Sequence, residues 1–424
     1  MIGAAAPTAP VLSRVADRAL LPLLVVLLVA LMTSITLVGV VTALIVVAGL
    51  VRLADPALRA RDQAPLAWPL LAFTIVTLAS ALHAAEPRLA VLESKGLIGI
   101  ALFLAAANGF RSGDDVRRAL RWLWLAVAVV SLHAMAQTWA CAGTAELPPW
   151  VGFILRVKLD ACRAASPFRA KAFFSIYMTL GGSLVIVLSL LAATFAAGAR
   201  ARRTERAVTT GLAAVAMALT YVRSAWLGLA VAVLVVAALT RRYVVLLVLL
   251  AATAALVLVP SPLQRRALSA ADRGDPSTTE RLHFWAAGAR MIRDAPVLGF
   301  GPGGVKRHYP AYRDPAARRP NTGHLHNNLV QIAVERGLAG LAAWLAIWVA
   351  FFAGARRVYA ALPAARAADR ALVVGSVAAV VGFLIAGLFE YNFGDSEVID
   401  LLWVVMAFPF VVEASTGATP AHEE

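Results

Sequence analysis

An almost unbroken apolar run extends from Ala19 to Val51. As a single helix this run would reach roughly 50 Å, whereas the hydrocarbon core of a bilayer is about 30 Å thick. The hydroxyl residues Thr33, Ser34 and Thr36 interrupt the run. We therefore expect two transmembrane helices here, joined by a very short connection.

The composition of the whole chain extends this expectation. The 424 residues are 61% hydrophobic and 15% charged, and the mean hydropathy is +0.77. A soluble core of this length could not bury so many apolar side chains, which excludes a large soluble domain. The expected fold class is an all-α polytopic integral membrane protein with about twelve transmembrane helices. The further spans are expected at 66–84, 92–110, 117–140, 173–197, 206–222, 224–240, 243–260, 338–357, 371–390 and 397–414.

The basic residues indicate the orientation of these spans. The formal net charge is +15, and the charges fall in short clusters between apolar runs, which is typical of membrane topology rather than of a nucleic-acid-binding face. Basic residues in short loops stay on the cytoplasmic side. Arg14 and Arg18 therefore place the N-terminus in the cytoplasm, and we expect the first span to be an uncleaved anchor. The alternate connections that carry arginines all fall on that same side, and the C-terminus follows them there.

Two long connections then face the opposite compartment. They are a smaller loop near 141–172 and a large loop at 261–337, so the chain divides into 1–260, 261–337 and 338–424. The two cysteines, Cys141 and Cys162, both belong to the smaller loop. In an oxidising periplasm they could form a disulfide, and two unpaired thiols are the alternative.

Both long loops are basic. Clustered guanidinium groups beside apolar spans suit an anionic ligand at the bilayer surface, because their planar fork pairs with phosphate oxygens. A solvated loop on anionic lipid headgroups is the alternative interpretation. Arg223 gives a stronger indication, since its turn is too short to be a solvated loop and a charge at that depth is costly without a partner. Snorkelling of its side chain to the interface is the alternative. The other anion-binding candidates are Arg163, Arg169, Arg265, Arg266 and Arg281.

The large loop has its own local pattern. TTERLHFWAAGARMIRDAPVLGFG predicts an amphipathic helix along the membrane surface, capped by Thr278 or Thr279 and ended by Pro296 with Gly299. GFGPGG at 299–304 follows a helix rather than a strand, so it predicts a tight turn and not a dinucleotide site. The apolar face of the helix is expected to consist of Leu282, Trp285, Ala289 and Ile292.

The most informative polar cluster is NTGHLHNNLVQIAVERGLAG, residues 321–340. Asn327 or Asn328 can cap a short helix that ends at Gly337. His326 then lies at the helix N-terminus, where the positive end of the dipole and desolvation both favour a neutral imidazole that can accept a proton. A structural capping histidine is one alternative. A metal ligand is another, because His324 and His326 form H-x-H, although the sequence offers no evident third ligand.

The segment HLHNNLVQIAVERGLAGL resembles the signature of the O-antigen ligase/polymerase superfamily. The matching residues are His326, Asn327, Glu335, Gly337 and Gly340. RLHFWAAGARMIRDAPVLGFGPGG, RAKAFFSIYMTLGG, YVRSAWLGL and LFEYNFGDSEV are also similar to parts of this superfamily, on a matching hydropathy plan. Together these stretches extend from about 169 to 400.

This resemblance implies a glycosyltransferase that moves O-antigen polysaccharide from undecaprenyl pyrophosphate to a sugar of lipid A-core, in lipopolysaccharide biosynthesis. It implies a site on the periplasmic face of the inner membrane and metal-independent, inverting chemistry without a cofactor. His326 would be the general base, while Arg223, Arg281 and Arg169 would hold the pyrophosphate. Asn327 and the remaining candidate arginines would contact substrate, and the role of Glu335 stays open.

Other functions fit the same parts. An O-antigen polymerase or a protein O-oligosaccharyltransferase would share the donor and differ in the acceptor. A solute transporter is the alternative of another class, since many spans with intramembrane charges would suit a carrier. Against it, the sequence contains no inverted repeat and no pair of Gly/Pro-broken spans in matching halves.

Overall fold

The computed structural model describes residues 11–417, except 144–146, 165–166, 199–201, 245, 248–249, 252–253, 255–257, 270–271 and 273. Within this described part all regular elements are helices, and no strand is present. They are α1 (Val11–Thr33), α2 (Ile35–Leu53), α3 (Pro56–Arg59), α4 (Ala67–His83), α5 (Pro87–Glu93), η1 (Ser94–Leu97), α6 (Ile98–Gly109), α7 (Gly113–Ala142), α8 (Pro149–Ile154), α9 (Leu159–Ala164), α10 (Tyr177–Ala196), α11 (Arg203–Leu219), α12 (Arg223–Thr240), α14 (Pro262–Leu268), α15 (Pro276–Asp294), α16 (Gly304–Tyr312), α17 (Asn328–Ala361), α18 (Ala367–Ala386), η2 (Asn392–Gly394) and α19 (Ser396–Gly417).

Nine helical stretches in the described part are long and apolar enough to cross a bilayer. They are α1, α2, the continuous stretch Pro87–Gly109, α7, α10, α12, α17, α18 and α19. This confirms a polytopic membrane protein. The expected span at 66–84 is the shorter apolar helix α4, and the one at 206–222 is α11, which begins with charged residues. The expected span at 243–260 falls partly outside the described residues, so the total of about twelve stays a prediction.

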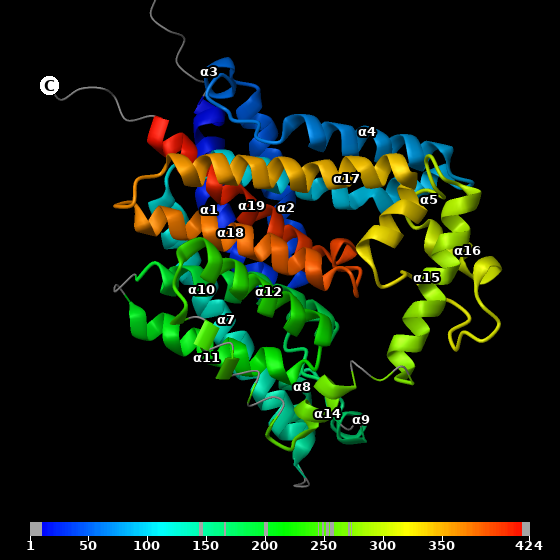
Figure 1. Cartoon of the computed structure of the whole chain (residues 1–424). Helices are drawn as coiled ribbons and strands as arrows, with labels where there is room; N and C mark the ends of the chain where they lie inside the picture. Colours follow the sequence, from blue (N-terminus) through cyan, green and yellow to red (C-terminus); the bar gives the residue numbers. More distant parts are fainter. Residues whose placement is uncertain are drawn as a thin grey trace, which may run out of the picture.

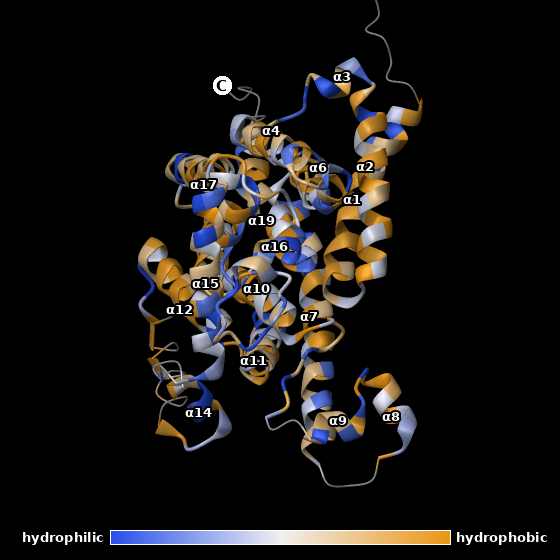
Figure 2. Ribbon diagram, turned by 90° about the vertical axis from the view of Figure 1, so that its right-hand side faces the viewer, coloured by the Kyte–Doolittle hydropathy of each residue, from blue (hydrophilic) through white to orange (hydrophobic). Residues whose placement is uncertain are grey.

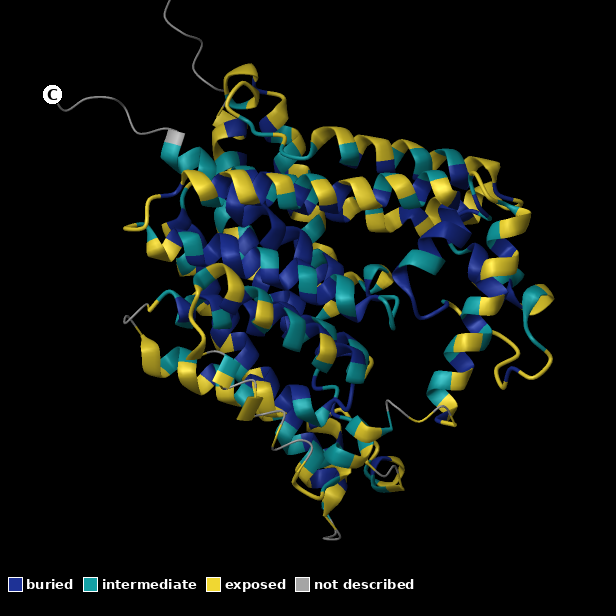
Figure 3. Cartoon of the chain, in the orientation of Figure 1, coloured by how far each residue is buried: buried dark blue, intermediate teal, exposed yellow. Residues whose placement is uncertain are grey.

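The long helices pack into one bundle. α10, α12 and α18 contact one another, α1 packs on α2 and α7, and α19 contacts α1, α6, α7, α10, α17 and α18 (Figure 1). Figure 3 shows the buried residues gathered where these helices meet. α15 and α16 lie at the end of α17 opposite the C-terminus (Figure 1). The connection that carries α15 and α16 therefore gathers at this end of α17.

The outward sides of the bundle are apolar. Figure 2 shows hydrophobic residues along the outer sides of α1, α2 and α7. Val40 is 54%, Leu125 57% and Val349 69% exposed. Such large contiguous apolar surfaces are unfavourable in water and suit contact with lipid tails.

Helix α17 is broken at Gly337, as the sequence predicts. Gly337 has φ +66°, and the segment that follows α15 docks against this break. Leu338 N donates to Pro296 O at 2.7 Å, and Phe300 N donates to Val334 O at 2.9 Å. These bonds satisfy backbone groups that the break leaves without helical partners. The large connection is thereby fixed to the start of α17.

The glycine-rich segment forms the tight turn that its sequence predicts. Gly299, Gly301 and Gly303 all have positive φ, a conformation that costs glycine little. Gly303 N donates to Glu335 Oε1 at 3.0 Å, and Arg336 Nη1 donates to Glu335 Oε2 at 3.1 Å. Glu335 is 3% exposed, so its role in the structure is to anchor this turn beside the break in α17.

Helix α15 departs from the prediction at its start and on its packed face. Asp275, not Thr278 or Thr279, is the N-cap, and its carboxylate accepts from Ser277 N and Thr278 N. The buried apolar residues are Phe284, Ala287 and Met291, whereas Leu282 is 56% exposed. Of the four residues of the predicted apolar face, Trp285 and Ile292 pack partly buried against this cluster, whereas Leu282 and Ala289 are exposed. The reason is that α15 packs between α16 and α17, a tertiary contact that local periodicity does not encode.

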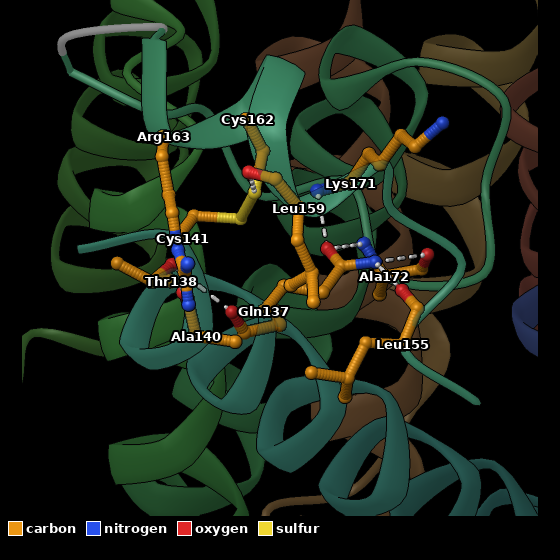
Figure 4. Close-up of a disulfide and its surroundings, with 11 residues drawn as sticks. Gln137, Thr138, Ala140, Cys141, Leu155, Leu159, Cys162, Arg163, Lys171 and Ala172 are labelled. Atoms are coloured by element: carbon orange, nitrogen blue, oxygen red, sulfur yellow. Dashed lines mark hydrogen bonds between the residues drawn. A yellow bond between two sulfur atoms is a disulfide. The ribbon is translucent and has the colours of Figure 1, made fainter. Parts of the chain in front are cut away.

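The smaller connection is attached to the end of α7. Cys141 and Cys162 form a disulfide that joins α7 to α9 (Figure 4). Gln137, which is fully buried, donates to Leu155 O at 2.7 Å and Ala172 O at 3.0 Å. These contacts hold the segment before α10 against α7, which positions the residues from Arg169 onward.

Candidate functional site

The start of α17 is tied to the connection between α18 and α19. Asn327 caps the helix by accepting from Val330 N at 3.1 Å and also donates to Leu388 O at 2.9 Å. Asn328 N donates to Gly387 O at 2.7 Å. Both polar groups of the Asn327 side chain are therefore engaged within the protein. Asn327 therefore positions the start of α17, whereas the sequence predicted that it contacts substrate.

These bonds bring His326 against Glu390. Nδ1 of His326 lies 2.9 Å from Oε1 and 3.1 Å from Oε2 of the Glu390 carboxylate. His326 has φ +50°, an uncommon conformation for a residue with a side chain, and its ring stacks on Phe284 with centroids 5.6 Å apart. The histidine is thus held from two sides in one orientation.

Glu390 was not assigned a role from the sequence, although it belongs to the quoted stretch LFEYNFGDSEV. Burial alone would raise the pKa of its carboxyl group, but the hydrogen bond to His326 and the nearby charges outweigh burial and lower that pKa. The carboxylate is therefore ionised at neutral pH and accepts a hydrogen bond. An isolated acidic residue directly after an apolar span was the available signal.

A cavity of about 190 Å³ opens beside this pair. Its lining comes from the segment before α10, the start of α12, α14, α15 and the segments that carry His326 and Glu390. Among the described residues, five arginines line it against two carboxylates. The polar and aromatic lining residues are Arg169, Tyr177, Tyr221, Arg223, Ser224, Arg266, Ser277, Glu280, Arg281, Phe284, Arg319, His326 and Glu390.

Arg223 and Arg266 share one carboxylate. Arg223 Nη2 lies 3.1 Å from Asp275 Oδ1, and Arg266 Nη1 lies 3.5 Å from Asp275 Oδ2. Arg223 Nη1 also donates to Ser269 Oγ at 2.8 Å. Burial, followed by the charges of Arg223 and Arg169, lowers the pKa of Arg266 to about 10. Two guanidinium groups therefore face a single carboxylate, which leaves an excess of positive charge at this side of the cavity.

Asp275 is a second residue that sequence reasoning missed. Burial alone would raise the pKa of Asp275, but the charge and the hydrogen bond of Arg223 outweigh burial and lower it. The same carboxylate caps α15, so Asp275 couples the first turn of this helix to the arginines. A signal was present in the sequence, since Asp-Pro is a typical helix start.

Arg281 and Arg169 complete the basic side of the cavity. Arg281 Nη1 donates to Ser277 Oγ at 3.3 Å, and its Nη2 lies 3.9 Å from Glu390 Oε2. Arg169 Nη1 donates to the Tyr177 hydroxyl at 2.8 Å. Arg281 therefore lies between the other arginines and the His326–Glu390 pair.

Two predicted arginines lie elsewhere. Arg163 Nε donates to Ala140 O at 3.3 Å beside the disulfide (Figure 4). Arg265 is exposed and does not line the cavity. The structure brings together Arg169, Arg223, Arg266, Arg281 and His326 and leaves these two outside.

His324 gives the cluster a further possible chemistry. Its ring centroid lies 4.2 Å from that of His326, and burial, together with the charge of His326, lowers its pKa to about 4. His324, His326 and Glu390 each offer one ligand atom, all within 4.8 Å of one another. Glu390 is the third ligand that the H-x-H pattern lacked. Two imidazoles and a carboxylate are a ligand set that suits Zn²⁺.

Comparison with known proteins identifies the segment that carries most of this site. The family model described as O-antigen ligase matches residues 208–345, which confirms the resemblance seen in the sequence. The matched segment contains Arg223, Arg266, Arg281 and His326. Among curated proteins, none matches the chain.

Proposed function

Since residues 208–345 match the O-antigen ligase family, whose superfamily consists of glycosyltransferase-type enzymes, we propose that this protein is an O-antigen ligase. It transfers O-antigen polysaccharide from undecaprenyl pyrophosphate to a sugar of lipid A-core, in lipopolysaccharide biosynthesis. The observation that carries the proposal is the His326–Glu390 pair at the edge of an arginine-lined cavity. This pairing supplies a proton acceptor and a diphosphate site side by side.

The arginines bind the donor. Arg223, Arg266 and Arg281 hold the pyrophosphate, and Arg169 and Arg319 add positive charge from the same cavity wall. Guanidinium groups pair with phosphate oxygens through two parallel hydrogen bonds. Fixed charges of this kind stabilise the negative charge that develops on the leaving pyrophosphate, and they require no reorganisation when the bond breaks.

Glu390 prepares His326 to accept a proton. Nδ1–H of His326 donates a hydrogen bond to the ionised carboxylate. This bond fixes the tautomer in which Nε2 carries the lone pair. Nε2 removes the proton of the acceptor hydroxyl as that oxygen bonds to the sugar C1. The C1–O bond to pyrophosphate breaks, and its electron pair leaves with the phosphate oxygen. General base catalysis contributes about 10²–10⁴-fold in rate.

A single displacement of this kind inverts the anomeric centre. In the proposed reaction the acceptor oxygen attacks C1 from the side opposite the leaving pyrophosphate, so His326 acts on the acceptor and the arginines act on the leaving group. In this mechanism the arginines supply the positive charge that many pyrophosphate-cleaving enzymes take from a metal ion. The transfer is therefore metal-independent.

The reaction takes place on the periplasmic face of the inner membrane, and both termini are cytoplasmic. In support, the Cys141–Cys162 disulfide precedes Arg169 by only a few residues, and disulfides persist in oxidising compartments. At the opposite ends of the spans, the connections carry basic residues such as Arg59 and Arg61, which is typical of the cytoplasmic side. The polyprenol chain of the donor lies among the apolar helices next to the cavity.

A reconstituted transfer reaction tests the proposal. Purified protein in proteoliposomes is mixed with undecaprenyl-pyrophosphate glycan and rough lipopolysaccharide. We expect laddered lipopolysaccharide, which is lost in His326→Ala and retained in an exposed control pair, Arg59→Gln/Arg61→Gln. Product that is only longer polyprenyl-linked glycan would replace the ligase assignment with a polymerase. Solute uptake without any glycan transfer would remove the enzyme assignment.

A further inference from the structure

A second, larger groove lies next to the candidate site and has a different lining. Its volume is about 1290 Å³, and it opens between the α8–α9 connection and the segment before α10. The apolar lining includes Phe153, Ile154 and Phe168, and the basic lining consists of Arg156, Lys158 and Lys171. Among the described residues that line it, Asp160 is the one carboxylate. The groove thus combines an apolar surface with an excess of positive charge.

The two walls of this groove are held in place. Gln137 joins them, because it donates to Leu155 O on one wall and to Ala172 O on the other, and its Oε1 accepts from Ala172 N at 2.9 Å. The disulfide fixes α9 to α7, the helix that also carries Gln137 (Figure 4). The groove is therefore preformed rather than created when a molecule binds.

The surface around the groove suits a membrane interface. Trp139 is 68%, Trp150 62% and Phe153 86% exposed. Aromatic side chains gather where the acyl region meets the headgroups, since their rings are partly apolar. Lys158 is exposed and Lys171 half-buried beside them, and basic side chains next to such an aromatic belt suit the anionic headgroups of lipids.

The groove also adjoins the candidate site along the chain. Phe168 and Lys171 line the groove, whereas Arg169, between them, lines the arginine-rich cavity. A molecule in the groove is thereby brought to the edge of the reaction site. No lining residue of the groove belongs to the set that we assign to the donor.

We propose that this groove binds the phosphorylated acceptor lipid, with an acyl chain against Phe153 and Phe168 and a phosphate against Lys158, Lys171 and Arg156. The charge complementarity selects an anionic lipid. Because the groove adjoins Arg169 at the reaction site, we assign the bound lipid as the acceptor rather than as a bulk membrane lipid. This assignment rests on the proposed function. Recognition of the acceptor then combines its lipid phosphate with the sugar hydroxyl that reacts at His326.

Lipid binding to the purified full chain tests the groove without any transfer reaction. The probes are diphosphoryl lipid A, its dephosphorylated form and phosphatidylglycerol, and bound lipid is measured by native mass spectrometry. We expect Lys158→Gln/Lys171→Gln to weaken binding of diphosphoryl lipid A by about tenfold. Phe153→Ser, at a highly exposed position, should weaken binding of both forms of lipid A. The matched control is Arg59→Gln/Arg61→Gln, which should bind as the wild type does.

Transfer kinetics separate the groove from the proposed function. We expect the lysine double variant to raise the acceptor KM by about tenfold while the donor KM is unchanged. Equal lipid A binding by this variant and the wild type would overturn the groove assignment even if transfer is observed. Phosphatidylglycerol binding as tight and as lysine-dependent as that of lipid A would overturn the acceptor assignment. Lysine-dependent lipid A binding without transfer by the wild type would support the groove and overturn the ligase function.

Discussion

Nδ1 of His326 lies 2.9 Å from Oε1 of Glu390, a residue 64 positions away in the sequence. The contact depends on the start of α17 being bonded to the connection after α18, where Asn328 N donates to Gly387 O. A backbone hydrogen bond therefore holds the two segments together beside the side-chain contact. This relationship gives the first test of the mechanism.

Glu390→Gln should reduce kcat by about 10²-fold or more, because the amide keeps the shape of the side chain but loses the charge that stabilises a protonated His326. The measurement is the single-turnover rate of glycan transfer. In the double variant with His326→Ala the losses should not add, since both residues act through one proton transfer. The control is Glu86→Gln, at an exposed position in the same chain. A Glu390→Gln enzyme with near-normal kcat would contradict the assigned roles.

Asp275→Asn should strengthen donor binding. The carboxylate now lies against Arg223 and Arg266 and competes with the pyrophosphate for them, whereas asparagine caps a helix about as well as aspartate does. We expect the donor KM to fall by about fivefold, on the order of 1 kcal/mol. Asp272→Asn is the matched control, because that exposed carboxylate accepts from Gly274 N. A higher donor KM in Asp275→Asn would mean that Asp275 positions the arginines rather than competing for them.

Acid should destabilise the protein partly through His324. Its pKa falls from 6.5 to about 4 in the folded protein, so the unfolded chain binds the proton more tightly. The contribution to stability is full above about pH 6.5 and is lost as the pH falls toward about 4. As the pH is lowered over this range, the thermal unfolding midpoint in detergent should therefore fall less steeply in His324→Asn than in the wild type. His83→Asn, at an exposed histidine, should keep the wild-type slope. Parallel profiles for His324→Asn and the wild type would refute this role.

Chelation separates the arginine mechanism from a metal mechanism. We expect transfer to survive EDTA treatment, and His324→Asn to keep most of its activity, because the arginines supply the charge in the cavity. Metal content is measured on the same samples. Activity that is abolished by EDTA, restored by Zn²⁺ and lost in His324→Asn would establish His324, His326 and Glu390 as a metal centre instead.

Gly337→Ala should destabilise the fold by about 2–4 kcal/mol, because a Cβ there would require a strained left-handed conformation and would meet the backbone of Val297. The measurement is the thermal unfolding midpoint in detergent. Gly39→Ala is the control, since no atom lies within 4 Å of a Cβ at that position, and alanine is the better helix former by about 1 kcal/mol. A variant at Gly337 as stable as the wild type would show that the α15–α17 connection does not depend on this break.

Local features of the sequence were sufficient to predict several structural elements. The apolar runs predicted membrane-crossing helices because length and hydropathy are properties of contiguous residues. Asn327 as a cap, the break at Gly337 and the turn at 299–304 followed from backbone preferences of single residues. His326 was chosen for its place at a helix N-terminus, Arg223 for its place at the end of a span, and Arg169, Arg266 and Arg281 for clustered positive charge in the long loops; one cavity now holds them all.

Other features were decided only by the tertiary structure. Glu390 reaches His326, and Asp275 reaches Arg223, through helices that are distant in the sequence, so no local spacing predicts either pair. The buried face of α15 centres on Phe284, Ala287 and Met291 because α17 approaches closely at Gly288, where an added Cβ would meet Val330. Arg163 and Arg265 carry the same charge as the arginines in the cavity, yet their positions exclude them. The sequence by itself determined where helices form and which charged residues are available, because both depend on residue type and on the length of apolar runs. Close packing between helices distant in the sequence determined which of those charged residues come into contact.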